Sequence, residues 1–147
     1  MSIFDERFVQ VVDEALTWEE ALQVSGDLLK EQGKIEQSYI DAMIQNVHEL
    51  GPYIVIAPRV AMPHARPENG VQARGISVVT LKQPVAFSED PKHTVSLIVC
   101  LAAVDADSHL KLLQTVSGWL ADESVLNELI DAESTEDLQH RLKEFYF

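Results

Sequence analysis

The sequence predicts an α/β domain in which helices cover both faces of a sheet, and three features of its apolar pattern support this fold class. Residues 95–104 (VSLIVCLAAV) are apolar almost throughout, which is typical of a central strand buried on both faces. Residues 76–81 (ISVVTL) form a second run of strand length. Apolar residues recur at helical spacing before and after these runs, so we expect the strands to lie between helices.

The length and composition fit one domain over residues 1–147, which is large enough to bury a hydrophobic core. The apolar fraction of 46% and the charged fraction of 24% are ordinary for a globular protein. No stretch resembles a signal peptide, and no apolar run is long enough to span a bilayer. We therefore expect no direct membrane insertion and a cytoplasmic location.

The net charge of −13, from 24 acidic and 11 basic residues, argues against nucleic acid as a partner, because phosphate backbones need clustered Lys and Arg. This charge favours solubility and encounter with a basic protein surface. The single cysteine, Cys100, lies inside the 95–104 run, and we interpret it as a buried strand thiol.

Two helices are expected in the N-terminal third of the chain. Thr17-x-x-Glu20 is a capping box, which predicts a helix that ends near Gly33. A second helix is expected over residues 38–50, because apolar residues recur along one side and a Gly-Pro pair follows. Short strands are expected over residues 8–12 and 53–56.

The C-terminal half is expected to add two more helices. Pro84, Pro91 and the acidic residues 88–90 predict a turn region between the two long strands. A third helix is expected to start near residue 107 or 108, and a last one near residue 134 or 135. Their inward-facing residues are expected to be Leu110, Leu113, Val116 and Leu120 in the third helix, and Leu138, Leu142 and Phe145 in the last.

The stretch over residues 51–70 carries the strongest chemical signal, a histidine in a stiff loop. His64 directly follows Pro63, whose fixed φ stiffens the backbone ahead of the imidazole. An imidazole nitrogen is a good nucleophile and can carry a covalent intermediate. Arg59 and Arg66 offer fork-shaped donors to phosphate oxygens. These residues suit phosphoryl transfer; the alternative is a surface loop with an incidental histidine.

A second histidine, His109, is expected at the start of the third helix, just past the central strand. Ligands of α/β sheets bind beyond the carboxyl ends of strands, and a helix start offers N–H groups that favour phosphate. His109 and Ser108 are therefore candidates to hold a phosphoryl group on His64. The alternative is a first-turn histidine without a role.

Other site chemistries have less support. A zinc site is less favoured than phosphoryl transfer, because the chain has no paired cysteines and no closely spaced pair of histidines. No Walker loop or Gly-x-Gly-x-x-Gly motif is present, so nothing indicates ATP or a dinucleotide. We therefore expect neither a metal nor a cofactor.

Three blocks of the chain carry a family resemblance: Ala61-Met62-Pro63-His64, residues 105–109, and Trp119-Leu120-Ala121-Asp122-Glu123. With these blocks the chain resembles the IIA components of the bacterial phosphoenolpyruvate-dependent sugar phosphotransferase system (PTS), of the mannitol–fructose type. The resemblance covers nearly the whole chain, and the block GPYIVIAPRVAMPHARPE looks most like the ascorbate branch. It implies a mixed five-stranded sheet flanked by helices.

The resemblance also implies roles and partners. His64 would be the phosphorylated histidine, and His109 would support the phosphohistidine. His64 would take a phosphoryl group from phospho-HPr and pass it to a cysteine of a cognate IIB component, which serves an IIC permease. The protein would then be a phosphotransferase component in sugar transport, with L-ascorbate as the expected sugar.

One departure from the family concerns the arginine that binds phosphate. Mannitol-type members carry an active-site arginine in the helix before the histidine loop, whereas residues 44–48 here read IQNVH. Arg66 is the expected substitute, because an extended loop puts it on the same side as His64, two residues away. Arg59 is the second candidate. We also expect an apolar surface around His64, formed by Val60, Ala61 and Met62.

Two rival functions remain open at the level of sequence. IIA-like proteins of the nitrogen-related branch accept phosphate but signal by binding other proteins, and the same His64 chemistry would serve that role. A metal hydrolase would instead contain stoichiometric zinc and lose activity with a chelator.

Overall fold

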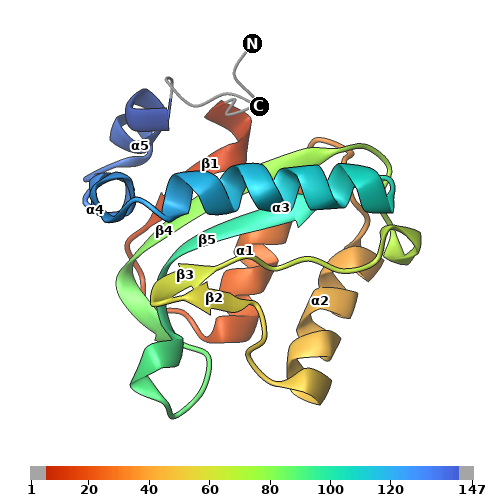
Figure 1. Ribbon diagram of the computed structural model, residues 1–147, viewed down its shortest axis with the longest axis horizontal. Helices are drawn as coiled ribbons and strands as arrows, with labels where there is room; N and C mark the ends of the chain where they lie inside the picture. Colours follow the sequence, from red (N-terminus) through yellow and green to blue (C-terminus); the bar gives the residue numbers. More distant parts are fainter. Residues whose placement is uncertain (1–5, 143–147) are drawn as a thin grey trace.

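The computed structural model describes residues 6–142, whose centre is a mixed five-stranded sheet with the order β1-β4-β5-β3-β2 (Figure 1). The strands are β1 (Val9–Val12), β2 (Val55–Ala57), β3 (Arg59–Ala61), β4 (Gly75–Ala86) and β5 (Thr94–Ala102). β1 pairs in parallel with β4, and β3 in parallel with β5, whereas β4 and β5 are antiparallel. The predicted mixed five-stranded sheet is thus confirmed.

Helices cover both faces of this sheet, as predicted. α1 (Trp18–Lys30) and α2 (Gln37–Leu50) lie on one face. α3 (Ala106–Leu120), α4 (Glu123–Ile130) and α5 (Thr135–Leu142) lie on the other, where α3 crosses in front of the sheet in Figure 1. The capping box of α1 is present in both directions between Thr17 and Glu20. Short 3-10 turns complete the fold: η1 (Glu6–Phe8), η2 (Pro67–Asn69) and η3 (Pro91–His93).

The central strand β5 divides the core between the two helical layers. Its residues from Val95 to Ala102 are all buried. Leu97, Val99 and Leu101 pack with the α3–α5 layer, while Ile98, Cys100 and Ala102 pack with the α1–α2 layer. This alternation is what a strand covered on both faces requires. Cys100 is a buried thiol as predicted, and burial raises its pKa to about 12.

The edge of the sheet next to the histidine loop differs from the prediction. The predicted strand over 53–56 is β2, and it turns directly into β3, which was not predicted. Pro58 and a φ of 76° at Arg59 make the turn of this hairpin. A proline followed by a positive φ is characteristic of a type II turn, where glycine usually takes the position that Arg59 holds. This turn could not be predicted from the residues, because arginine rarely adopts a positive φ.

A second difference concerns the turn expected around Pro84. β4 extends to Ala86, well past the predicted end at residue 81, so Pro84 lies in the strand. The register between β4 and β5 shifts between Thr80 and Val85, and Pro84 is exposed at this irregularity. A proline needs no ladder partner for its nitrogen there, which is why the strand tolerates it.

The C-terminal helices also correct the prediction. The block that starts at Trp119 does not simply continue the third helix, because α3 ends at Leu120 and a separate helix, α4, starts at Glu123. Asp122 caps α4 by accepting a hydrogen bond from the Ser124 N–H. Leu110 is 54% exposed rather than inward-facing. Phe145 lies outside the described residues.

Candidate functional site

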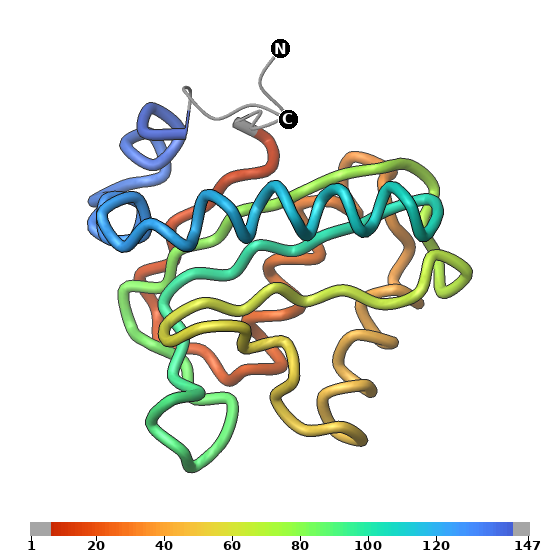
Figure 2. Tube along the Cα trace, in the orientation of Figure 1, coloured from red at the N-terminus to blue at the C-terminus, as the bar shows by residue number. Residues whose placement is uncertain are grey.

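His64 lies where the chain leaves β3 and passes the C-terminal end of β5. The trace in Figure 2 shows this segment running without regular structure from β3 towards η2. The Leu101 N–H of β5 donates to the Pro63 carbonyl at 3.1 Å and so ties the loop to the sheet. Because β3 and β5 are parallel, the loop sits beyond the carboxyl ends of two neighbouring strands.

The His64 ring is oriented by its own backbone. Nδ1 lies 2.8 Å from the Met62 carbonyl oxygen. Since a carbonyl only accepts hydrogen bonds, Nδ1 must carry the proton of the neutral imidazole. Nε2 is then the unprotonated nitrogen, and its lone pair is available to a ligand.

His109, in the first turn of α3, faces this ring. The centroids of the His64 and His109 rings are 4.7 Å apart, and their planes are inclined by 53°. Partial burial lowers the pKa of His109, and the coulombic influence of His64 lowers it further. His109 is therefore neutral at pH 7 and can donate one hydrogen bond. The structure thus brings the two predicted histidines into contact.

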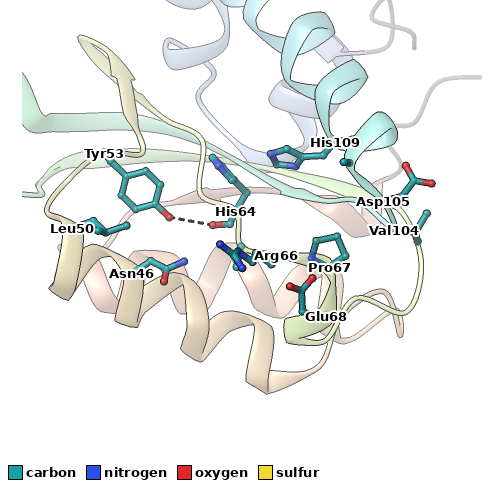
Figure 3. A pocket seen from close by; sticks show the side chains of 12 residues that line it. Asn46, Leu50, Tyr53, His64, Arg66, Pro67, Glu68, Val104, Asp105 and His109 are labelled. Carbon is teal, nitrogen blue, oxygen red and sulfur yellow. Dashed lines mark hydrogen bonds between the residues drawn. The ribbon is translucent and has the colours of Figure 1, made fainter.

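Both histidines open into a pocket of about 560 Å³. Arg66 lines the same pocket, and Figure 3 shows it beside Asn46, across from the two rings. The backbone of Arg66 is extended (φ −74°, ψ 145°), which is the conformation assumed when it was predicted to share a side with His64. Its guanidinium makes no hydrogen bond or ion pair with another residue in the described range 6–142. Its donors are therefore free for an anion.

Arg59 points elsewhere. Its guanidinium donates to Asn127 Oδ1 of α4 at 2.7 Å, and it lines a separate hollow of about 400 Å³ with Pro58 and Glu123. Arg59 does not line the pocket that contains the two histidines. The structure does not bring Arg59 together with His64.

Ser108 has a local partner at the start of α3. Its backbone N–H donates to Asp105 Oδ1 at 2.7 Å, which is the N-cap contact of the helix. Hydrogen bonds from Ser108 lower the pKa of Asp105. Because this N–H is already satisfied, the geometry gives little support to the prediction that Ser108 binds phosphate. Asp105 itself lines the pocket.

The sequence did not single out three of the residues that complete this pocket. Asn46 of α2 lines the pocket. Tyr53 donates a hydrogen bond to the His64 carbonyl at 3.3 Å, and its ring stands edge-on to the imidazole. Partial burial raises the pKa of Tyr53, while a hydrogen bond with Asn46 opposes this. Glu68 adds a carboxylate on the side of Arg66 (Figure 3).

The apolar surface near the pocket has a different composition from the one predicted. Val60, Ala61 and Met62 are fully buried and form core, so the prediction that they surround His64 at the surface was wrong. Alternation along β3 and its parallel pairing with β5 place them between the helical layers. Among the described residues, the large exposed apolar side chains are those of Leu50, Tyr53, Ile56, Val104 and Leu110. Leu50, Tyr53 and Val104 line the pocket.

Residues 6–142 contain neither a metal-binding cluster nor a membrane-spanning helix. No group of three His, Cys, Asp or Glu side chains in that range is placed to hold a metal ion. No helix in the same range has the length and apolar character needed to cross a membrane.

Comparison with solved structures and known families identifies the fold as that of phosphotransferase-system IIA proteins. Residues 2–145 match the family "Phosphoenolpyruvate-dependent sugar phosphotransferase system, EIIA 2", and the chain belongs to this family. PTS EIIA components are in general phosphotransferases.

Individual relatives fall in the same group. The ascorbate-specific PTS system EIIA component of Escherichia coli strain K12 is 43% identical over 108 residues, which cover 74% of this chain and 70% of that protein. The solution structure of the mannitol-specific cryptic phosphotransferase enzyme IIA CmtB from Escherichia coli superimposes with a TM-score of 0.87 at 36% identity, covering 97% of this chain and 98% of that one. IIAMtl, in its complex with phosphorylated IIBMtl from Escherichia coli, gives a TM-score of 0.74 at 26% identity, with 88% of this chain and 89% of that one covered.

Proposed function

We propose that this protein is the phosphoryl carrier of a PTS sugar uptake system, in which His64 accepts phosphate from phospho-HPr and passes it to a cysteine of a cognate IIB component. One observation carries the proposal. The Met62 carbonyl holds Nδ1–H of His64, so Nε2 is left with a free lone pair in a pocket that also contains His109 and Arg66.

In this transfer the protein supplies one nucleophile, Nε2 of His64, and otherwise positions the reacting groups and stabilises their charge. The Nε2 lone pair attacks phosphorus, a P–N bond forms, and the bond between phosphorus and the donor breaks. In the second transfer a thiolate sulfur of IIB attacks, and the P–N bond returns its electrons to Nε2. The transition state is loose, with negative charge spread over the equatorial oxygens. Hydrogen bonds from Arg66 and His109 would stabilise that charge.

The surroundings of the pocket suit a site that two proteins visit in turn. Exposed apolar side chains lie at its edge, which is how the centre of a protein interface is built. The net charge of −13 favours a donor with a basic surface. The complex of a similar IIA with phosphorylated IIB supports the proposed acceptor.

The names of the relatives suggest the sugar. Proteins 43% and 37% identical to this chain are ascorbate-specific EIIA components, so we take L-ascorbate as the transported substrate. Phosphate would reach it through IIB during passage through an IIC permease, and this protein would touch IIC only indirectly. The reaction would take place in the cytoplasm.

Onward transfer tests this function against the regulatory alternative. The protein is first phosphorylated with phosphoenolpyruvate, enzyme I and HPr, and then mixed with a purified ascorbate-type or mannitol-type IIB. We expect rapid transfer to the ascorbate-type IIB and slow transfer to the other. Phosphate that enters the protein but reaches no IIB would favour the nitrogen-PTS type of regulatory role instead.

A further inference from the structure

The histidine loop is joined to β5 by an interrupted parallel ladder. The Leu101 N–H donates to the carbonyl of Pro63, the residue before His64. In a regular parallel pair, the Leu101 carbonyl would accept directly from the N–H of Ala65, the residue after His64. Instead a hydroxyl from another element stands between these two groups. The Tyr39 hydroxyl donates to the Leu101 carbonyl at 2.6 Å and accepts from the Ala65 N–H at 3.0 Å.

The Tyr39 hydroxyl suits this position because it both donates and accepts. Its one proton goes to the Leu101 oxygen, since the Ala65 carbonyl is farther away at 3.4 Å. Tyr39 comes from α2 and its side chain is 0% exposed, so neither water nor a partner protein reaches it. Burial also raises the pKa of Tyr39 well above its ordinary value, so the hydroxyl keeps its proton.

We propose that Tyr39 is a positioning residue for phosphoryl transfer, because its hydroxyl sets how far the loop around His64 stands from β5. This inference rests on the proposed function of His64. The hydroxyl acts as a spacer of fixed size between two backbone groups. Without it, the Ala65 N–H and the Leu101 carbonyl would either lose their hydrogen-bond partner or move together and bond directly. Either change moves the backbone on one side of His64, and with it Nε2 relative to His109 and Arg66.

A second contact from the same helix supports this role of α2. The Ser38 hydroxyl, next to Tyr39 in the sequence, donates to the Asn69 carbonyl at 2.7 Å. α2 thus holds the loop at two places, once beside His64 and once at η2. The position of the nucleophile therefore depends on α2 as well as on the sheet.

The test uses Tyr39→Phe in the full chain, which removes one oxygen and keeps the ring. Ser77→Ala is the matched control, because the Ser77 hydroxyl is equally buried and also joins the sheet to a helix, donating to the Ser25 carbonyl at 2.7 Å. Each variant is phosphorylated over a range of phospho-HPr concentrations, and the ¹⁵N chemical shifts of the His64 ring are recorded without phosphate.

For Tyr39→Phe we expect the saturated rate to fall about 10- to 100-fold, because a misplacement of about 1 Å can cost about 10²-fold. The half-saturating concentration of phospho-HPr should not change, since Tyr39 is buried and cannot touch the donor. The His64 ring shifts should also move. Ser77→Ala should match the wild type in all three measurements. A Tyr39→Phe variant with the saturated rate and ring shifts of Ser77→Ala would overturn the proposal.

Two further outcomes remain decisive. If the wild type accepts no phosphate, the proposed function fails, and the His64 ring shifts alone decide whether Tyr39 positions the ring. If Tyr39→Phe does not fold, the wild type is examined for a nuclear Overhauser effect between the Tyr39 hydroxyl proton and the Ala65 amide proton. Its presence supports the interposed hydroxyl, and its absence overturns it.

Discussion

At the scale of single residues, the site contains two neighbouring imidazole rings whose nitrogens are in different hydrogen-bonding states. The His64 ring has one nitrogen bound to a carbonyl and one nitrogen free. The His109 ring, 4.7 Å away, stays neutral because burial and its neighbour disfavour the cation. A neutral His109 keeps one N–H donor for an incoming phosphoryl group and places no positive charge beside His64.

This arrangement predicts that His109 titrates differently once His64 carries phosphate. The pKa of His109 is lowered in the free protein, whereas a phosphoryl group brings negative charge that favours the imidazolium. Phosphorylation should therefore raise the pKa of His109 and cause proton uptake near neutral pH. An NMR titration of His109 before and after phosphorylation measures this, with His64→Ala taken through the same treatment as the control. An unchanged His109 titration curve in the phosphorylated protein would remove His109 from the phosphate site.

Substitution of Arg66 and of Arg59 should affect the kinetics of phosphoryl transfer differently. Arg66 lines the pocket, and its guanidinium has no hydrogen bond or ion pair with another residue of the range 6–142. Arg66→Ala should therefore slow phosphoryl transfer even at saturating HPr, by about 10²–10³-fold, as for other transition-state donors. Arg59 is bound to Asn127 outside the pocket, so Arg59→Ala should leave the saturated rate unchanged and at most weaken association. Rapid-quench kinetics of both variants decide this. The reverse pattern would show that Arg59 is the phosphate ligand.

At the scale of elements, the packing of α1 against α2 supports the site, because α2 carries Tyr39 and Asn46. Gly26 of α1 marks the closest approach: a Cβ there would lie 2.5 Å from Cγ1 of Ile40, which is fully buried. Such overpacking costs about 1–3 kcal/mol, more than the roughly 0.5–1 kcal/mol that alanine gains over glycine inside a helix. Gly26→Ala should thus lower the free energy of unfolding.

Gly118 provides the matched control in α3, since a Cβ there would meet nothing within 4 Å. Gly118→Ala should raise the free energy of unfolding by about 0.5–1 kcal/mol. Urea unfolding of both variants measures the two changes. Equal stabilisation by both substitutions would show that the α1–α2 contact is looser than described.

The elements also show where sequence reasoning succeeds. The apolar run of β5, the capping box of α1 and the start of α3 are local signals, and all three were predicted correctly. The β2–β3 hairpin was missed because its turn places an arginine at a positive φ. α4 was missed because it follows α3 after only Ala121 and Asp122, so the periodicity looked continuous.

At the scale of the whole molecule, the site forms from segments that only the tertiary fold brings together. His64 and His109 were predicted as candidates because each carries a local signal, a proline before one and a helix start beside the other. Tyr39 had no such signal: its hydroxyl bonds to backbone atoms 26 and 62 positions away. Local residue patterns do not reveal contacts of that range.

The net charge of −13 predicts how the protein meets its donor. If phospho-HPr approaches with a basic surface, the second-order rate constant for phosphorylation should fall as salt rises, because salt screens exposed charges beyond about 8–10 Å at physiological ionic strength. The saturated rate should change little, since the pocket itself is partly enclosed. Rapid-quench assays at a series of NaCl concentrations measure both rate constants. A rate constant independent of salt would mean that apolar contacts alone drive the encounter.

The most direct measurement of the central claim is the location of the phosphate. Wild type and His64→Ala are incubated with phosphoenolpyruvate, enzyme I and HPr, and analysed by mass spectrometry at neutral or basic pH. The wild type should gain a single phosphoryl group on His64. His64→Ala should gain none while it stays folded, because the half-buried side chain makes one hydrogen bond, whose loss costs about 0.5–1.5 kcal/mol. Phosphate at normal stoichiometry on His64→Ala, or wild-type phosphate on another residue, would contradict the account.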